Sequence, residues 1–274
     1  MSIDLREATP LVLIGAGKMG GAMLLGWLDR GLPPDGVVVI EPHPSDELKA
    51  LAATRGVRLE STAPAGLTAR VMVVAVKPQV LDAVLPLFAG LVGAETVVVS
   101  VVAGKTIAAF ERGLATTRIV RTIPNTPSQV GRGITAAHAV ATVPPTDCDL
   151  VSVLLATLGR LEWVDREDLI DVATAVSGSG PAYVFHMAEA LAAAGAAAGL
   201  EPALATRLAR ATVEGAGELL WQSPETPDTL RKNVTSPGGT TAAALAVLMG
   251  EDGLTKLMTE AVAAAAKRSR ELAG

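Results

Sequence analysis

Three glycines near the start of the chain have the spacing of a phosphate-binding loop. Residues 15–20 are Gly-Ala-Gly-Lys-Met-Gly, a G-x-G-x-x-G pattern that directly follows the apolar run 11–14. In such a loop the first glycine permits a tight turn, the second lets the backbone approach a pyrophosphate, and the third allows the next helix to pack closely. The phosphates then meet free N–H groups at the positive end of that helix. The pattern predicts a dinucleotide site at Ile14, Gly15, Ala16, Gly17, Lys18, Met19 and Gly20.

An acidic residue lies about 20 residues after this loop, where dinucleotide-binding folds hold the adenosine ribose. It is Glu41, at the end of the second apolar run. An acid there accepts hydrogen bonds from the ribose hydroxyls and repels a 2′-phosphate, which favours NADH. A solvated charge at the end of a strand is the alternative interpretation, and His43 and Ser45 could instead serve a 2′-phosphate. We predict that NADH is used at least as well as NADPH.

Two more segments lie where a parallel sheet binds its ligand. Ala75-Val76-Lys77-Pro78 follows the third predicted strand, and residues 100–104, which include Val102 and Ala103, follow the next. The carboxyl ends of parallel strands form the ligand crevice in this architecture. We therefore expect both segments at the cofactor, although a loop lysine such as Lys77 is more often simply solvated.

The C-terminal half contains a second glycine-containing loop that opens a helix. Residues 233–241 are Asn-Val-Thr-Ser-Pro-Gly-Gly-Thr-Thr. Gly238 and Gly239 leave backbone N–H groups unobstructed, while Thr240 and Thr241 add hydroxyls at the helix start. Such a terminus suits a small anion, for instance a carboxylate. An ordinary N-cap preceded by a turn explains the pattern equally well on chemistry alone.

An earlier serine-rich segment, residues 177–183, looks at first like a nucleophile elbow. That motif, G-x-S-x-G, needs a glycine two residues before the serine. Ser179 has Ser177 at that position, and Ser177 has Ala175. We therefore expect a tight turn of small residues before a helix that begins at Pro181.

Charge and metal-ligand content argue against several classes of partner. Lysine and arginine total 23 against 28 acids, a net charge of −5, with no basic run, so we expect no nucleic-acid binding. Cys148 is the one cysteine, and no two of His43, His138 and His186 are spaced four apart. We expect no disulfide and no metal site.

The apolar composition raises the question of a membrane. The mean hydropathy is +0.42, but the longest apolar candidate, residues 172–188, is interrupted by serines, glycines, a proline and a histidine. A spanning helix needs roughly 20 mostly apolar residues in a row. Residues 1–10 have no apolar signal core. We expect no membrane span and a cytoplasmic location.

The elements around these motifs predict two halves. Short Val- and Ile-rich runs typical of buried parallel strands alternate with helical patterns up to about residue 165. These runs are residues 11–14, 37–40, 71–76, 97–102 and 118–121. Ala-rich helical segments follow, at residues 181–199, 202–221, 240–250 and 253–272. The predicted class is α/β, with a Rossmann-type doubly wound sheet in a dinucleotide-binding domain (1–165) and an all-α dimerisation domain (166–274).

The second half is unusually apolar for its size. Hydrophobic residues make up 50% of the chain and aromatic residues only 3%. Part of this content belongs to the strands, and the rest is Ala, Gly and Leu that recur around whole helices, as in residues 190–200. A helix that is apolar all round must be buried. About 110 helical residues cannot easily achieve this alone, so we predict that a partner subunit covers them.

Taken in order, these motifs resemble those of the pyrroline-5-carboxylate reductase family. The resemblance runs from about residue 11 to residue 272, and its most specific segments lie in the second half. They are residues 15–20, 75–78, 124–127 (Pro-Asn-Thr-Pro), 177–183 (Ser-Gly-Ser-Gly-Pro-Ala-Tyr) and 236–241. The resemblance implies a Rossmann domain and a helical domain that interlocks two subunits, with a decamer of five dimers as the larger expected form. It also implies the last step of proline synthesis, with NADPH or NADH as cofactor.

The resemblance further implies individual roles. The substrate carboxylate is expected on the loop formed by Ser236, Gly238, Gly239, Thr240 and Thr241. Thr241 is expected near the ring nitrogen as the catalytic residue, Asn233 near the nicotinamide ribose, and Glu167 near the substrate amine. Many members have a serine at the position of His43, so this chain departs from the pattern that serves NADPH.

The residues by themselves leave two alternative functions to consider. A β-hydroxyacid dehydrogenase would use a lysine base on a helix near the domain boundary, but the helix after Pro181 has no lysine through Gly199. A dinucleotide-binding regulator would need the glycine loop but not residues 236–241. Turnover of the cyclic imine distinguishes the reductase from both.

Overall fold

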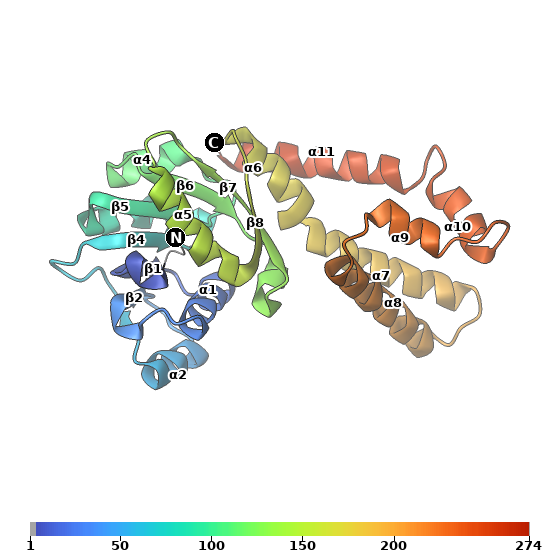
Figure 1. Cartoon of the computed structure of the whole chain (residues 1–274), viewed down its shortest axis with the longest axis horizontal. Coiled ribbons are helices and arrows are strands. Elements are labelled where there is room, and N and C mark those ends of the chain that lie inside the picture. The colour runs from blue at the N-terminus through green and yellow to red at the C-terminus, as the bar shows by residue number, and fades with distance from the viewer. Residues whose placement is uncertain (1–3, 274) are drawn as a thin grey trace. The chain divides into compact units, whose positions relative to one another are not determined.

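The computed structural model describes residues 4–273, which form two compact units. The first unit runs to Gly178 and also contains the chain from Ala265 onward, and the second is Ser179–Ala264. The first unit thus extends past the expected boundary near residue 165. The reason is packing, because helix α6 (Asp168–Ala173) lies against strands β6 and β7 of the sheet. Figure 1 shows the elements of both units.

The first unit is built on an eight-stranded sheet with the order β3-β2-β1-β4-β5-β6-β7-β8. All neighbouring strands are parallel except β6 and β7, which are antiparallel. The strands are β1 (Leu11–Ile14), β2 (Val37–Ile40), β3 (Arg58–Glu60), β4 (Ala69–Val74), β5 (Val92–Ser100), β6 (Ile119–Ile123), β7 (Gly133–Ala139) and β8 (Gly159–Trp163). The five predicted strands are present, and β3, β7 and β8 are additional. β3 and β8 are half exposed and carry charges, so they lack the apolar run that marks a buried strand.

Both faces of the sheet are covered, which explains the Val-rich strands. Leu11 and Leu13 of β1 face one layer, with Trp27 at its centre, while Val12 and Ile14 face a second layer around Phe110. The first layer is supplied by α1 (Lys18–Asp29), α2 (Asp46–Arg55) and α5 (Pro145–Leu155), and the second by α3 (Pro78–Val84) and α4 (Ile107–Leu114). The doubly wound fold class is confirmed.

Local signals place the helix ends. The hydroxyl of Ser45 accepts the N–H of Leu48 at 3.2 Å and caps α2, and Gly56 ends that helix with φ +74°. Short 3₁₀ helices connect other elements, at Leu5–Ala8, Pro34–Gly36, Leu85–Leu91, Thr126–Val130 and Ala156–Leu158. A π-helical turn, Thr174–Gly178, follows α6 and takes the place of the simple turn that we expected before Pro181.

The second unit is entirely helical and has almost no core of its own. Its helices are α7 (Gly180–Ala197), α8 (Pro202–Gln222), α9 (Pro227–Asn233) and α10 (Thr240–Leu248), together with the first part of α11 (Leu254–Ala273). Among its described residues the buried apolar side chains are Ala205 and Ala209, whereas Phe185, Leu219 and Val247 are 64%, 61% and 75% exposed. A surface with this much apolar exposure marks an interaction site. Among the described residues, no helix combines the length and apolarity needed to cross a bilayer.

Candidate active site

The glycine loop joins β1 to α1 in a conformation that excludes a side chain at Gly15 and at Gly20. Gly15 has φ +85°, and a Cβ there would lie 2.9 Å from the carbonyl oxygen of Ala75. A Cβ on Gly20 would collide with the carbonyl oxygen of Gly15, whereas one on Gly17 would have no neighbour within 4 Å. No side chain caps α1, and its first turn contains no acid. The loop therefore leaves open space at Gly17 next to uncapped N–H groups, which is the arrangement that binds a pyrophosphate.

Glu41 lies against this loop. Its Oε2 accepts the N–H of Ala16 at 3.1 Å, and its Oε1 accepts the N–H of His43 at 3.1 Å. The carboxylate thus joins the glycine loop to the segment that leads into α2. The His43 side chain is exposed.

The segments after β4 and β5 follow the carboxyl ends of the next two strands of the sheet after β1. Ala75 donates its N–H to the carbonyl of Ile14 at 2.8 Å, so residues 75–78 begin beside the glycine loop. Val76 is half-buried, Lys77 is exposed at the N-cap of α3, and Pro78 is the first residue of that helix. Val102 is buried and Ala103 exposed in the loop after β5. The first unit therefore gathers every predicted cofactor residue except Asn233, which belongs to the second unit.

The loop before α10 is a turn closed by a hydrogen bond from the N–H of Gly239 to the carbonyl of Ser236, at 3.1 Å. Pro237 occupies the second position of the turn, and Gly238 has φ +68° at the third, as in a type II turn. Gly239 is the N-cap of α10, no side chain caps the helix, and Thr240 and Thr241 begin it. The first turn contains no acid. This helix start can hold a small anion.

Asn233 ends α9 shortly before this loop. Its Nδ2 donates to Oε2 of Glu225 at 3.2 Å, a contact within the second unit. Glu225 was not among the residues singled out in the sequence. It lies just before α9, and its partner Asn233 is the last residue of that helix.

Glu167 belongs to the first unit and is the N-cap of α6. Its Oε1 accepts the backbone N–H of Ile107 at 2.8 Å and Nη1–H of Arg121 at 3.0 Å. Arg121 is buried and also contacts Asp171. Sequence reasoning missed Arg121, although a charged residue inside an apolar strand is a signal that it needs a partner.

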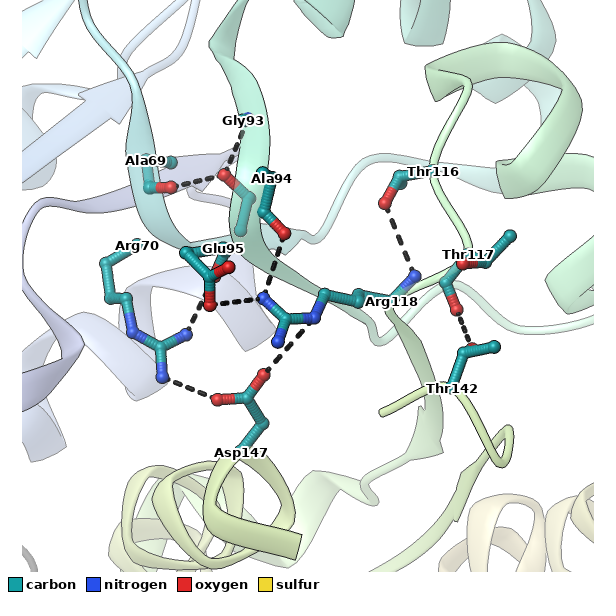
Figure 2. Close-up of polar contacts among 11 residues, drawn as sticks. Ala69, Arg70, Gly93, Ala94, Glu95, Thr116, Thr117, Arg118, Thr142 and Asp147 are labelled. Carbon is teal, nitrogen blue, oxygen red and sulfur yellow. Dashed lines mark hydrogen bonds and ion pairs between the residues drawn. The ribbon is translucent and has the colours of Figure 1, made fainter. Parts of the chain in front are cut away.

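A second ionic cluster lies at the amino ends of the strands, and Figure 2 shows its side chains. It joins Arg70 and Arg118, at the starts of β4 and β6, to the buried Asp147 of α5. Arg70 Nη2 is 2.5 Å from Asp147 Oδ1, and Arg118 Nη1 is 2.8 Å from Glu95 Oε2. Hydrogen bonding to Arg118 lowers the pKa of Glu95. Because this cluster lies at the amino ends of the strands, it is far along the sheet from the cofactor loops and ties α5 to three strands.

In the described part of the chain, residues 4–273, no group of three or more His, Cys, Asp or Glu side chains could hold a metal ion. The thiol of Cys148 is partly buried, and burial raises its pKa. It is therefore a poor nucleophile.

Sequence families match both parts of the chain. A family model described as pyrroline-5-carboxylate reductase dimerisation matches residues 167–272. A second, described as NADP oxidoreductase coenzyme F420-dependent, matches residues 10–104.

Curated proteins and solved structures match nearly the whole chain. The pyrroline-5-carboxylate reductase of Synechocystis is 41% identical over 265 residues, 96% of this chain and 97% of that protein. The Pseudomonas aeruginosa enzyme of the same name is 37% identical, over 97% of this chain and 98% of that protein. The structure of a Coxiella burnetii pyrroline-5-carboxylate reductase is 34% identical with a TM-score of 0.88, over 97% of this chain and 99% of that one. A Plasmodium falciparum pyrroline carboxylate reductase with NADP bound has a TM-score of 0.80 at 27% identity, over 98% of this chain and 99% of that one.

Proposed function

The chain belongs to the pyrroline-5-carboxylate reductase family, and from this premise we propose which of its residues carry the reaction. It is an NAD(P)H-dependent oxidoreductase that reduces the C=N bond of 1-pyrroline-5-carboxylate to give L-proline. The observation that carries this function is the 41% identity to a curated reductase across 96% of the chain. The test is loss of reduced-nicotinamide absorbance when the imine is added, with either cofactor. Absence of turnover with both would refute it.

The residues of the first unit fit a dinucleotide. The cofactor cradle is the open space beside Gly17, at the start of α1. A Cβ added to Gly17 would meet no other atom of the chain within 4 Å, and no side chain caps the helix there. Residues 14–20 would hold the pyrophosphate, with residues 75–78 and the pair Val102 and Ala103 along its path at the neighbouring strand ends. Asn233 would approach the nicotinamide ribose. The bound nicotinamide supplies the hydride.

The start of α10 is the proposed site for the substrate carboxylate. The turn 236–239 presents the N–H groups at the beginning of that helix, and no side chain of the helix occupies them. A carboxylate held there is stabilised by hydrogen bonds and by the helix dipole. Thr241, in the first turn, would donate to or orient the ring nitrogen. Holding the imine carbon in near-attack geometry can contribute several kcal/mol to catalysis, on the order of 7.

Glu41 is the proposed determinant of cofactor preference. Its carboxylate bonds to the glycine loop through Ala16, and the first turn of α2 adds Asp46 and Glu47. The cations nearby in the sequence are already paired, Lys49 with Asp46 and Arg58 with Glu60. A 2′-phosphate would therefore approach a net negative surface, which disfavours NADPH. We propose that this chain uses NADH at least as well as NADPH.

The helical unit is a dimerisation domain, and the chain works as a homodimer. Apolar side chains such as Phe185 and Leu219 need the cover that a second copy supplies. We further propose, from the family resemblance, that five dimers form a decamer. Light scattering distinguishes the mass of a decamer from that of a dimer.

Each of the two family matches lies within one of the two domains that we propose. We propose residues 1–165 as the dinucleotide-binding domain and residues 166–274 as the dimerisation and substrate domain, since the dimerisation match starts at residue 167. We also propose a cytoplasmic location, where reduced nicotinamide and a free thiol such as Cys148 are maintained. Cell fractionation tests it.

A further inference from the structure

A buried arginine joins two carboxylates at the side of the sheet where α6 packs. Arg121, in β6, is 2% exposed. Its guanidinium donates to Oε1 of Glu167 at 3.0 Å and to Oδ1 of Asp171 at 2.8 Å. A charge removed from water is tolerated only when it is paired and hydrogen-bonded. The two carboxylates meet this need, so Arg121 fixes the segment 167–171 against β6.

Glu167 extends this network to the loop that follows β5. The same Oε1 accepts the N–H of Ile107, the first residue of α4, at 2.8 Å. Thr106, the N-cap of α4, makes no side-chain cap of its own. Glu167 therefore satisfies one of the N–H groups that a helix start leaves without a partner. It thereby fixes the end of the loop 101–106, which contains Val102 and Ala103.

The C-terminal end of α11 reaches the same loop from another direction, within the first unit. The hydroxyl of Ser269 donates to Oδ1 of Asp171 at 2.8 Å, and both residues are buried. Farther along the helix, Leu272 lies against Gly104, since a Cβ on Gly104 would stand 3.0 Å from the Cβ of Leu272. Lys105 adds an ion pair with Asp82 of α3, at 2.7 Å. The loop is thus held at Gly104 and Lys105 and, just beyond its end, at Ile107.

We propose that Arg121 and Glu167 are positioning residues for the cofactor. They hold the loop 101–106 through the N–H of Ile107, so that Val102 and Ala103 are preset for the dinucleotide. Asp171 and Ser269 complete the support from the C-terminal helix. This inference rests on the proposed function, because it takes the loop after β5 as part of the cofactor site.

The role differs from the one that the family resemblance implies for Glu167. A substrate ligand needs an oxygen directed at the substrate amine. Here Oε1 already accepts two donors of this chain, and one of them is a buried guanidinium. One oxygen of the carboxylate is therefore committed to its own chain, and loss of the side chain acts first on the loop.

Two variants of Glu167 separate the roles. Glu167→Gln keeps an acceptor for Ile107 but removes the charge that pairs with Arg121, and Glu167→Ala removes both. The dissociation constant of NADH is measured by fluorescence titration without imine, and the KM of the imine at saturating NADH. We expect the NADH constant to rise by about fivefold in Glu167→Ala, the effect of losing one net hydrogen bond, and by less in Glu167→Gln. The imine KM stays unchanged.

Asp168→Asn is the matched control, because Asp168 is the adjacent acid, is exposed, and pairs with Arg166 rather than Arg121. It leaves both constants unchanged. Ser269→Ala tests the network from its other end and should also weaken NADH binding, which decides the matter even where Glu167→Ala fails to fold. A rise confined to the imine KM, or no change in NADH affinity in any variant, overturns the proposal. Failure of the unaltered chain to reduce the imine would refute the proposed function instead, while NADH titration still measures the positioning.

Discussion

The carboxylate of Glu41 accepts the backbone N–H of Ala16 at 3.1 Å, so the acid that directly follows β2 is hydrogen-bonded to the second residue of the glycine loop. A second hydrogen bond, from the N–H of His43, holds its other oxygen. The negative charge is therefore fixed in place at the edge of the cofactor cradle. A fixed charge discriminates between ligands more strongly than a mobile one, because no reorganisation relieves the repulsion.

Glu41→Gln should shift cofactor use toward NADPH. The amide keeps an acceptor for Ala16 but removes the charge that repels a 2′-phosphate, so we expect the ratio of kcat/KM for NADPH to that for NADH to rise by about tenfold, equivalent to about 1.4 kcal/mol. Steady-state kinetics with both cofactors measure the ratio. Glu95→Gln, at the opposite end of the sheet, is the control and leaves it unchanged. An unchanged ratio in Glu41→Gln and Glu41→Ala alike would show that this acid does not select the cofactor.

Thr241→Ala should lower kcat far more than it weakens cofactor binding. The hydroxyl lies in the first turn of α10, where the proposed role is to orient or protonate the ring nitrogen. General acid–base assistance of this kind is worth about 100-fold or more. We expect a fall of that size in kcat with an unchanged NADH dissociation constant. Thr241→Ser, which keeps the hydroxyl, restores most of the rate, and a full kcat in Thr241→Ala removes this residue from the mechanism.

Three neighbouring glycines give a matched series for the cofactor cradle. A Cβ on Gly17 meets nothing of this chain within 4 Å, so Gly17→Ala should fold normally yet lose most of its NADH affinity, because the methyl group occupies the space of the pyrophosphate. Gly21→Ala makes only an ordinary contact at 3.7 Å and should leave binding intact. Gly20→Ala drives its Cβ into the carbonyl of Gly15 and should lower the melting temperature as well. Normal NADH binding by Gly17→Ala would place the pyrophosphate elsewhere.

The parts of the fold that depend on local pattern could be predicted from the sequence. Strand β1 is four apolar residues buried on both faces, and the glycine loop follows it without a break. Ser45 and Gly56 mark the two ends of α2 by chemistry that acts within a few residues. Each of these signals lies inside the element that it describes, so one sequence suffices to find it.

The contacts that escaped prediction join residues far apart in the chain. Glu167 and Ile107 are separated by 60 positions, and Asp171 and Ser269 by 98. Strand β8 is found only because β7 offers it a partner, since its own sequence, Gly-Arg-Leu-Glu-Trp, alternates weakly and is half exposed. The periodic patterns of a sequence do not indicate which distant residues or strands will pair.

Acid should weaken the cluster at the amino ends of the strands. Arg118 holds the pKa of Glu95 below its ordinary value by hydrogen bonding and charge. Because the folded pKa is the lower one, this pair stabilises the fold above the unfolded pKa of about 4.3, and the contribution is lost as the pH falls through the folded value. The free energy of unfolding should therefore fall less steeply below about pH 5 in Glu95→Gln than in the unaltered chain. Urea unfolding at a series of pH values measures this slope, and identical slopes would show that Glu95 makes no contribution.

A single charge on the helical unit should break the dimer. Phe185 of α7 is 64% exposed in one chain and lines a groove with residues of α8 such as Arg210 and Val213. A second copy must cover it. A carboxylate buried there costs several kcal/mol, because Arg210 of the same groove already pairs with Glu214. We expect Phe185→Glu to lower the mass measured by light scattering at micromolar concentration below that of the unaltered chain, and to lower activity. Leu87→Glu is the matched control, because Leu87 is 69% exposed in the first unit and lies outside the dimerisation match, which begins at residue 167. If Phe185→Glu stayed dimeric, or if Leu87→Glu dissociated equally, the interface would have to lie on another surface.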